Sequence, residues 1–149
     1  MLLCDTNVWL AMVLSGHQSH SVAADWLDTV DSPNAVCFCR ATQRSLLRLL
    51  TTATVMGRFG SPPLTCRQAW RVYAHLLTDD RIALQAEEPP RLQARWKALT
   101  ANDTASPKAL MDAYLAAFAL AGGHTLVTTD KAFRAFAGLD YILLGSEGK

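Results

Sequence analysis

Short apolar runs alternate along the chain with longer segments in which apolar residues recur every three or four positions. The runs are typical of buried parallel strands, and the longer segments are typical of amphipathic helices. We predict strands within residues 1–4, 35–39, 82–84, 125–128 and 141–144. Strands that alternate with helices favour an α/β fold with a central parallel sheet of four to five strands, flanked by helices on both faces.

Residues that begin or end helices bound most of the periodic segments. Thr65 is a good N-cap, Pro89-Pro90 suits a first helical turn, and Gly122-Gly123 can end the helix that precedes it. The predicted helices cover residues 8–14, 19–30, 41–50, 66–77, 89–99, 109–121 and 132–136, and the predicted loops include 57–63 and 101–107.

Length and composition indicate a single domain over residues 1–149. Half of the residues are hydrophobic and 18% are charged, which excludes a disordered or fibrous chain. No apolar run approaches the roughly 20 residues of a membrane span, and no basic segment precedes an apolar one at the start, so we expect a cytoplasmic protein without a membrane segment. Four cysteines without a C-x-x-C pair are expected to be buried free thiols; they are Cys4, Cys37, Cys39 and Cys66.

The net charge of +1 conceals an uneven distribution of charge. Residues 1–39 contain four aspartates and no Lys or Arg, whereas residues 32–78 contain six arginines and no acid. Arginine favours bidentate contact with phosphate, so a polyanion could bind the second region. Three of these arginines recur every four residues and share one helix face, namely Arg40, Arg44 and Arg48. A solvated helix face or a protein interface is the alternative interpretation.

Three aspartates stand where predicted elements begin or end. Asp5 follows the first strand, Asp130 follows the strand at 125–128, and Asp112 lies in the first turns of the helix at 109–121. Ligands of open α/β sheets bind beyond the carboxyl ends of the strands, so these carboxylates can converge there. Converged carboxylates repel one another and normally need Mg²⁺ or Mn²⁺, which can activate water and stabilise a reacting phosphate. The alternative is that the aspartates only cap helices.

The residues around these aspartates resemble the PIN-domain ribonucleases, and within them the VapC toxins of type II toxin–antitoxin systems. The resemblance rests on residues 3–10 (LCDTNVWL), on 112–117 with Ala119, and on 126–130 with Phe133, and it extends over nearly the whole chain. It implies a parallel sheet flanked by helices, an acidic pocket that binds Mg²⁺ or Mn²⁺, and cleavage of RNA by metal-activated water. It also implies a VapB-like antitoxin as partner and a homodimer.

Carried over position by position, the resemblance assigns roles to particular residues. Asp5, Asp112 and Asp130 match the metal-binding aspartates, and Thr128 matches a hydroxyl that supports the last of them. The family usually has a glutamate where this chain has Gln43, which removes one negative charge and favours a single-metal site. Nothing in the spacing supports Glu87 or Glu88 as a replacement. The residues given supporting roles are Thr6, Asn7, Gln43 and Thr128, and Arg40, Arg44 and Arg48 are the candidate substrate contacts.

Two further groups of residues have simpler interpretations. His17 and His20 have a spacing that zinc sites use, but the loop that enters a helix around them favours capping or surface roles. His75 suits a helix C-terminus, and His124 lies in a turn. The tryptophans of the amphipathic helices are expected mainly in the core; they are Trp26, Trp70 and Trp96.

Three functional hypotheses follow from the sequence. The first is a metal-dependent endoribonuclease neutralised by an antitoxin. The second keeps the fold but makes the protein a catalytically weak RNA- or protein-binding module, with Gln43 as the lesion. The third, a small-molecule phosphohydrolase, fits poorly because Asp5-Thr6-Asn7 lacks a second aspartate two positions on and no glycine-rich phosphate loop follows a strand.

Overall fold

A five-stranded parallel sheet organises residues 1–145, the part of the chain that the computed structural model describes. The strand order is β3-β2-β1-β4-β5, and each neighbouring pair is parallel. The predicted α/β fold is confirmed. The strands are β1 (Leu2–Cys4), β2 (Val36–Cys39), β3 (Ile82–Gln85), β4 (Thr125–Thr128) and β5 (Tyr141–Leu143).

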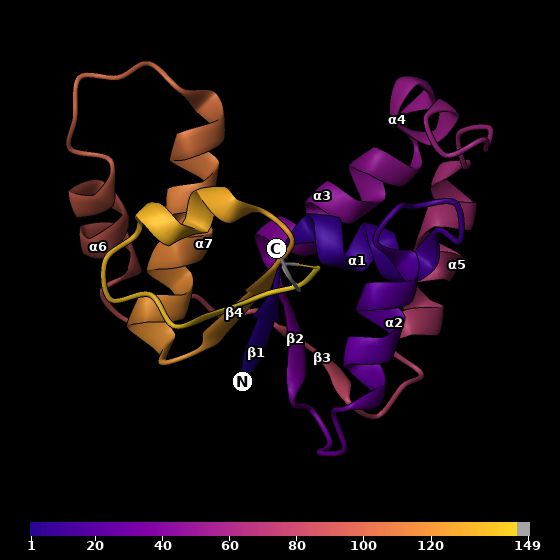
Figure 1. Cartoon of the computed structure of the whole chain (residues 1–149), viewed down its shortest axis with the longest axis horizontal. Helices are drawn as coiled ribbons and strands as arrows, with labels where there is room; N and C mark the ends of the chain where they lie inside the picture. Colours follow the sequence, from indigo (N-terminus) through magenta and orange to yellow (C-terminus); the bar gives the residue numbers. More distant parts are fainter. Residues whose placement is uncertain (146–149) are drawn as a thin grey trace.

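Helices cover both faces of this sheet (Figure 1). One face carries α1, α2, α3 and α5, and the other carries α6, α7 and the short helix η1. Side chains that alternate along each strand contribute to a hydrophobic core on each face of the sheet. In β2, Val36 and Phe38 belong to the first core, under α1, α2, α3 and α5, and Cys37 and Cys39 belong to the second, under α6, α7 and η1. The helices are α1 (Thr6–Val13), α2 (His20–Asp28), α3 (Arg40–Leu50), α4 (Ala53–Gly57), α5 (Cys66–Leu76), α6 (Leu92–Leu99), α7 (Pro107–Gly122) and η1 (Lys131–Ala135).

Helix ends follow the sequence where a capping side chain is present. Thr65 and Gln68 form the two reciprocal bonds of a capping box at the start of α5. The Ser106 hydroxyl accepts the Ala109 N–H, so α7 begins at Pro107, two residues before the predicted start. Gly123 ends α7 with φ 67°, a left-handed conformation that glycine adopts without strain.

Other expectations from the sequence were wrong. The short helix α4 was not predicted, because five residues are too few to show a helical period. The predicted helix at 89–99 begins only at Leu92, since Arg91 has φ 69° and interrupts any helix that Pro89-Pro90 could start. Trp70 was expected in the core but is 52% exposed, and Cys66 was expected to be buried but is exposed, unlike the other three cysteines.

Among residues 1–145, no helix is long and apolar enough to cross a membrane.

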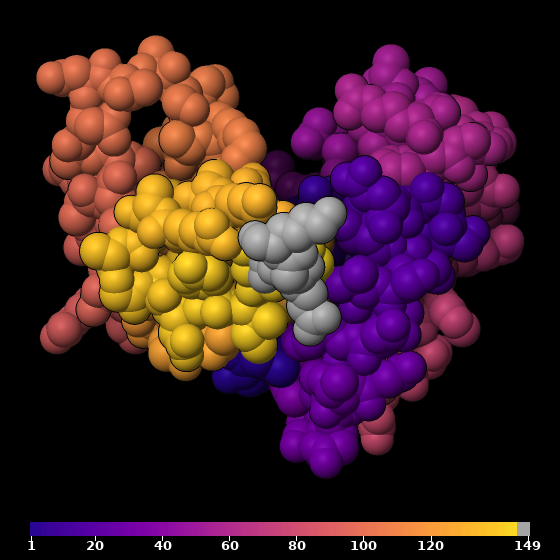
Figure 2. Space-filling model, viewed as in Figure 1, coloured from indigo at the N-terminus to yellow at the C-terminus, as the bar shows by residue number. Residues whose placement is uncertain are grey.

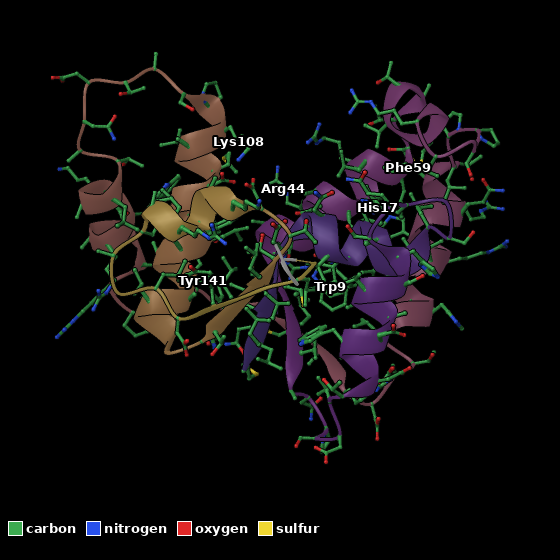
Figure 3. All side chains as sticks on the ribbon, viewed as in Figure 1. Trp9, His17, Arg44, Phe59, Lys108 and Tyr141 are labelled. Carbon is green, nitrogen blue, oxygen red and sulfur yellow. The ribbon has the colours of Figure 1, made fainter. Side chains whose placement is uncertain are left out.

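Trp9 is the largest fully buried side chain of the first core (Figure 3). Its ring stacks on Phe38 of β2, with centroids 3.7 Å apart and planes 8° from parallel. The indole N–H donates a hydrogen bond of 3.1 Å to the Cys4 carbonyl, which satisfies its polar atom inside the core. Trp9 therefore fixes α1 against the sheet directly behind the end of β1.

Replacing Trp9 with alanine is expected to lower the free energy of unfolding by about 3–5 kcal/mol, because a large cavity opens at a site that backbone hydrogen bonds keep rigid. Urea denaturation followed by circular dichroism measures the change. Trp70→Ala is the matched control and should cost less than about 1 kcal/mol, since most of that side chain already contacts water. Equal losses in the two variants would contradict this assignment of the core.

Candidate active site

The chain changes direction across the sheet at β1. It runs outward from β1 through β2 to β3 and then returns to the other side of β1 as β4. Such a switch point leaves a crevice beyond the carboxyl ends of the two strands, where the helices that follow them diverge. A hollow of about 370 Å³ lies there, and Figure 2 shows it opening between the orange end of α7 and the magenta helices α3 and α4.

The three predicted aspartates line this hollow together. Asp5 follows β1 directly, and Asp130 stands two residues after β4. Asp112 projects from the second turn of α7. Asp5 therefore lies at one edge of the sheet with two aspartates that follow it by more than 100 positions, and for Asp130 this is expected from the parallel strands β1 and β4.

Asp5 is the most buried of the three, with 8% of its surface exposed. Its Oδ2 accepts a hydrogen bond of 2.6 Å from the Thr128 hydroxyl, and its Oδ1 accepts the Asn7 N–H at 2.8 Å as the N-cap of α1. Burial raises the pKa of Asp5, the bonds from Thr128 and Asn7 oppose that rise, and the charges of Asp112 and Asp130 add to it. The Asp5 carboxylate is thus rigidly held in an environment that disfavours its charge.

Asp112 and Asp130 share a cation that the sequence analysis missed. The Lys108 Nζ lies 2.6 Å from Asp112 Oδ2 and 2.7 Å from Asp130 Oδ2. The hydrogen bond from Lys108 lowers the pKa of Asp130, with a smaller contribution from the Ala132 N–H. Lys108 and Asp112 stand four residues apart on α7, which is the one sequence pattern that could have revealed the contact.

The donors around the hollow suit a hard cation. Carboxylate oxygens are the ligands that Mg²⁺ and Mn²⁺ prefer, and the Lys108 ammonium stands where a cation would neutralise Asp112 and Asp130. In the described part of the chain, no three His, Cys, Asp or Glu side chains are already arranged around one metal position. A metal ion would have to take the place of the Lys108 ammonium.

Comparison with known proteins shows the family. The sequence profile of the PIN domain matches residues 2–139. Ribonuclease VapC41 of Mycobacterium tuberculosis (strain H37Rv) is 58% identical over 144 residues, which cover 97% of this chain and 99% of that protein. The chain belongs to the VapC group of the PIN-domain family.

Solved structures show that proteins of distant sequence share this fold. VapBC2 from Rickettsia felis, bound to a DNA fragment from its promoter, superposes with a TM-score of 0.65 at 14% identity over 96% of this chain and 98% of that chain. VapC20 of Mycobacterium tuberculosis, described as a sarcin-ricin loop cleaving toxin, gives a TM-score of 0.61 at 17% identity over 93% and 98% of the two chains. At these identities the likeness extends to the fold alone.

The supporting residues of this PIN domain occupy different surroundings. Thr6 and Asn7 line the hollow, and Thr128 is fully buried behind Asp5. Gln43 lies outside the lining, is buried, and accepts a hydrogen bond of 2.6 Å from Arg40 through its Oε1. The residues of α3 that face the hollow are instead Ala41, Thr42, Ser45, Arg48 and Leu49.

The three candidate arginines occupy different surroundings: two line hollows near the aspartates, and one does not. Arg48 lines the hollow of the aspartates, and Arg44 and Arg48 both line an adjacent hollow of about 500 Å³. Arg40 is the arginine that bonds Gln43, and it lines neither hollow. In Figure 3, Lys108 on α7 and Arg44 on α3 mark the two helices that border this region.

His17 and His20, the two histidines with zinc-like spacing, contact nearby backbone groups instead. The His17 Nδ1 accepts the Ser19 N–H at 3.0 Å, and its ring stacks on Phe59 with centroids 4.9 Å apart (Figure 3). The His20 Nδ1 lies 2.7 Å from the Ala11 carbonyl. His17 is buried, so the predicted surface role is wrong for it, while the capping role agrees with its bond to Ser19.

Asp5→Asn is expected to raise the melting temperature of the metal-free protein at neutral pH. The folded protein raises the pKa of Asp5, so stability is lost as the pH rises from the unfolded-state pKa to the folded-state pKa, and the full loss persists at neutral pH. Asparagine carries no such charge, and its advantage should shrink as the pH falls through the pKa of Asp5 toward the unfolded value. Thermal unfolding in EDTA across a pH series measures the effect, and a gain that grows toward acid pH would contradict it.

Proposed function

We propose that this protein is a Mg²⁺- or Mn²⁺-dependent endoribonuclease. The observation that carries the proposal is that Asp5, Asp112 and Asp130, from three distant segments, line one hollow at the switch point of the sheet. The 58% identity to a protein named a ribonuclease, over nearly the full length of both chains, supports the same activity.

Under this proposal, some residues of the hollow bind the metal ion and others contact the RNA substrate. Asp5, Asp112 and Asp130 would hold the ion, which when bound lowers the pKa of a water molecule and offsets charge on the reacting phosphate. Thr128 and Asn7 keep the Asp5 carboxylate in one orientation through their hydrogen bonds. Arg48, from α3, lines the same hollow and would contact the phosphate oxygens.

The substrate and the partners follow from charge and from the family. In the part of the chain that the structure describes, Arg44 and Arg48 form no ion pair, so both guanidinium groups are available to RNA phosphates. We infer a VapB-like antitoxin that neutralises the activity, because structural neighbours are VapBC complexes. A homodimer and a cytoplasmic location are further parts of the proposal.

The alternative of a catalytically weak binding module receives no support from the placement of Gln43. That hypothesis needs Gln43 to weaken the acidic pocket from within, whereas its side chain lies outside the lining and is bonded to Arg40. All three aspartates remain in the hollow. We therefore favour the enzyme over the binding module.

Asp5→Asn is expected to reduce RNA cleavage by at least about 100-fold, because the charge stabilisation that a bound metal supplies is worth several kcal/mol. Cleavage of total RNA by the purified wild-type chain should require Mg²⁺ or Mn²⁺ and stop in EDTA. Gel electrophoresis of the RNA measures both effects.

Asp103→Asn is the matched control for this experiment. Asp103 is an exposed residue outside the hollow, so the variant loses the same charge without changing the site and should cleave like the wild type. Intact RNA at high concentrations of protein and Mg²⁺, or equal activity of the Asp5 variant, would overturn the proposed function.

Lys108→Met is expected to increase the affinity for Mn²⁺ roughly fivefold to tenfold, because the ion no longer competes with an ammonium for Asp112 and Asp130. Without metal the variant should melt at a lower temperature than the wild type, since the two carboxylates then repel one another. Saturating Mn²⁺ should raise its melting temperature more than that of the wild type. Calorimetric titration and thermal unfolding measure these changes.

Lys97→Met provides the control, since Lys97 is an exposed lysine on α6 and lies outside the hollow. Its affinity for Mn²⁺ should equal that of the wild type. If Lys108→Met binds Mn²⁺ with unchanged or lower affinity, Lys108 does not occupy the position of the metal.

A further inference from the structure

Trp70 is a large apolar side chain that the fold leaves open to solvent. It stands on α5 with 52% of its surface exposed. Its ring meets Tyr73 edge-to-face, with centroids 5.9 Å apart and planes at 84°. Tyr73 in turn packs edge-to-face on the buried Phe38. Trp70 is therefore supported by the core at one side while much of its ring remains accessible.

Trp70 is connected to the active site by a series of hollows that share Arg48. The hollow of the aspartates contains Arg48, and so does the adjacent hollow of about 500 Å³ with Arg44 and Leu47. A third hollow of about 190 Å³ is lined by Leu47, Arg48 and Trp70. We name this surface the α3–α5 track and define it by Arg44, Leu47, Arg48 and Trp70. It extends from the active site across α3 to α5.

The charge of the α3–α5 track suits an anionic chain. Arg44 and Arg48 have no ion-pair partner among residues 1–145. Arg67 lies one helical turn before Trp70 and is exposed and likewise unpaired within the same range. No acidic residue occurs between residues 32 and 78. A second copy of the same surface would bring these arginines against each other, whereas a phosphate backbone would neutralise them.

We propose that the α3–α5 track binds a single-stranded segment of the RNA substrate beside the cleaved bond, with Trp70 stacked on an unpaired base. Arg44 and Arg48 contact the intervening phosphates. The assignment of an unpaired base follows from geometry, since a base within a duplex has both faces covered by its neighbours. This inference rests on the proposed ribonuclease function and deepens it by assigning Trp70 to substrate selection.

The test compares two probes that differ only in their bases. One is a single-stranded oligouridylate, and the other is an abasic ribose-phosphate chain of equal length. Binding is measured in Mg²⁺ with Asp5→Asn as the parent protein, so that the RNA remains intact. The parent should prefer oligouridylate by about 10- to 100-fold, and Trp70→Ala should bind oligouridylate no better than the abasic chain.

Three further variants separate stacking from other roles. Trp70→Phe keeps an aromatic face and should retain most of the preference for bases, whereas Trp70→Leu keeps apolar bulk and should lose it. The double variant Arg44→Gln with Arg48→Gln should weaken binding of both probes alike. It should also reduce the slope of log affinity against log salt by about 1.4, since single strands lose about 0.7 per phosphate contact.

The outcomes distinguish this inference from the proposed function. If the wild-type chain cleaves RNA while all Trp70 variants bind both probes like the parent, the proposed ribonuclease function is supported and the proposed role of Trp70 is overturned. If Trp70→Ala and Trp70→Leu change the oligomeric state in gel filtration while the preference for bases is unchanged, the track is a protein interface and the inference is overturned. If the wild type neither cleaves nor binds RNA, both proposals fall.

Discussion

The hydrogen bond from the Thr128 hydroxyl to the Asp5 carboxylate is the constraint on which the site depends. It joins residues 123 positions apart and continues the pairing of β1 with β4 by one step beyond Cys4 and Val127. A buried carboxylate next to two others is costly unless donors surround it. Thr128, the Asn7 N–H and the positive end of α1 supply that compensation. The parallel register therefore holds the charge in place as well as the strands.

Lys108 offsets the repulsion between the carboxylates of Asp112 and Asp130, the two more exposed aspartates. Its side chain is 64% exposed, whereas Asp112 and Asp130 are 19% and 32% exposed, so the ammonium approaches the pair from the solvent side. Exposed ion pairs contribute little to stability, and a lysine side chain has many other rotamers. The metal-free state is thus neutralised by a group that is easily displaced, while Asp5 stays fixed beneath it.

The sequence was sufficient to predict that Asp5 and Asp130 meet, because the carboxyl ends of the parallel strands β1 and β4 lie at one edge of the sheet, where α7 adds Asp112. Asp5 and Asp130 follow apolar runs that only a buried parallel sheet accommodates. The side chains that surround the acids depend on the rotation of each helix about its axis, which periodicity does not determine to one residue. On α3, the bonds between Thr42 and Cys39 set that rotation, so Ser45 and Arg48 face the hollow and Gln43 does not.

Trp70 shows the same limit at the edge of an apolar stripe. Ala69 and Tyr73 lie on the buried face of α5, and Trp70 stands one position beyond it, where hydrophobicity alone predicts burial. The exposed Trp70 is related to the active site through Arg48, which lines both the hollow of the aspartates and the hollow beside Trp70. Three carboxylates repel RNA, so under the proposed function the site would accept a phosphate only with a cation among the carboxylates and the arginines of α3 beside them. Metal binding and RNA binding should therefore strengthen one another, since each ligand reduces the charge that opposes the other.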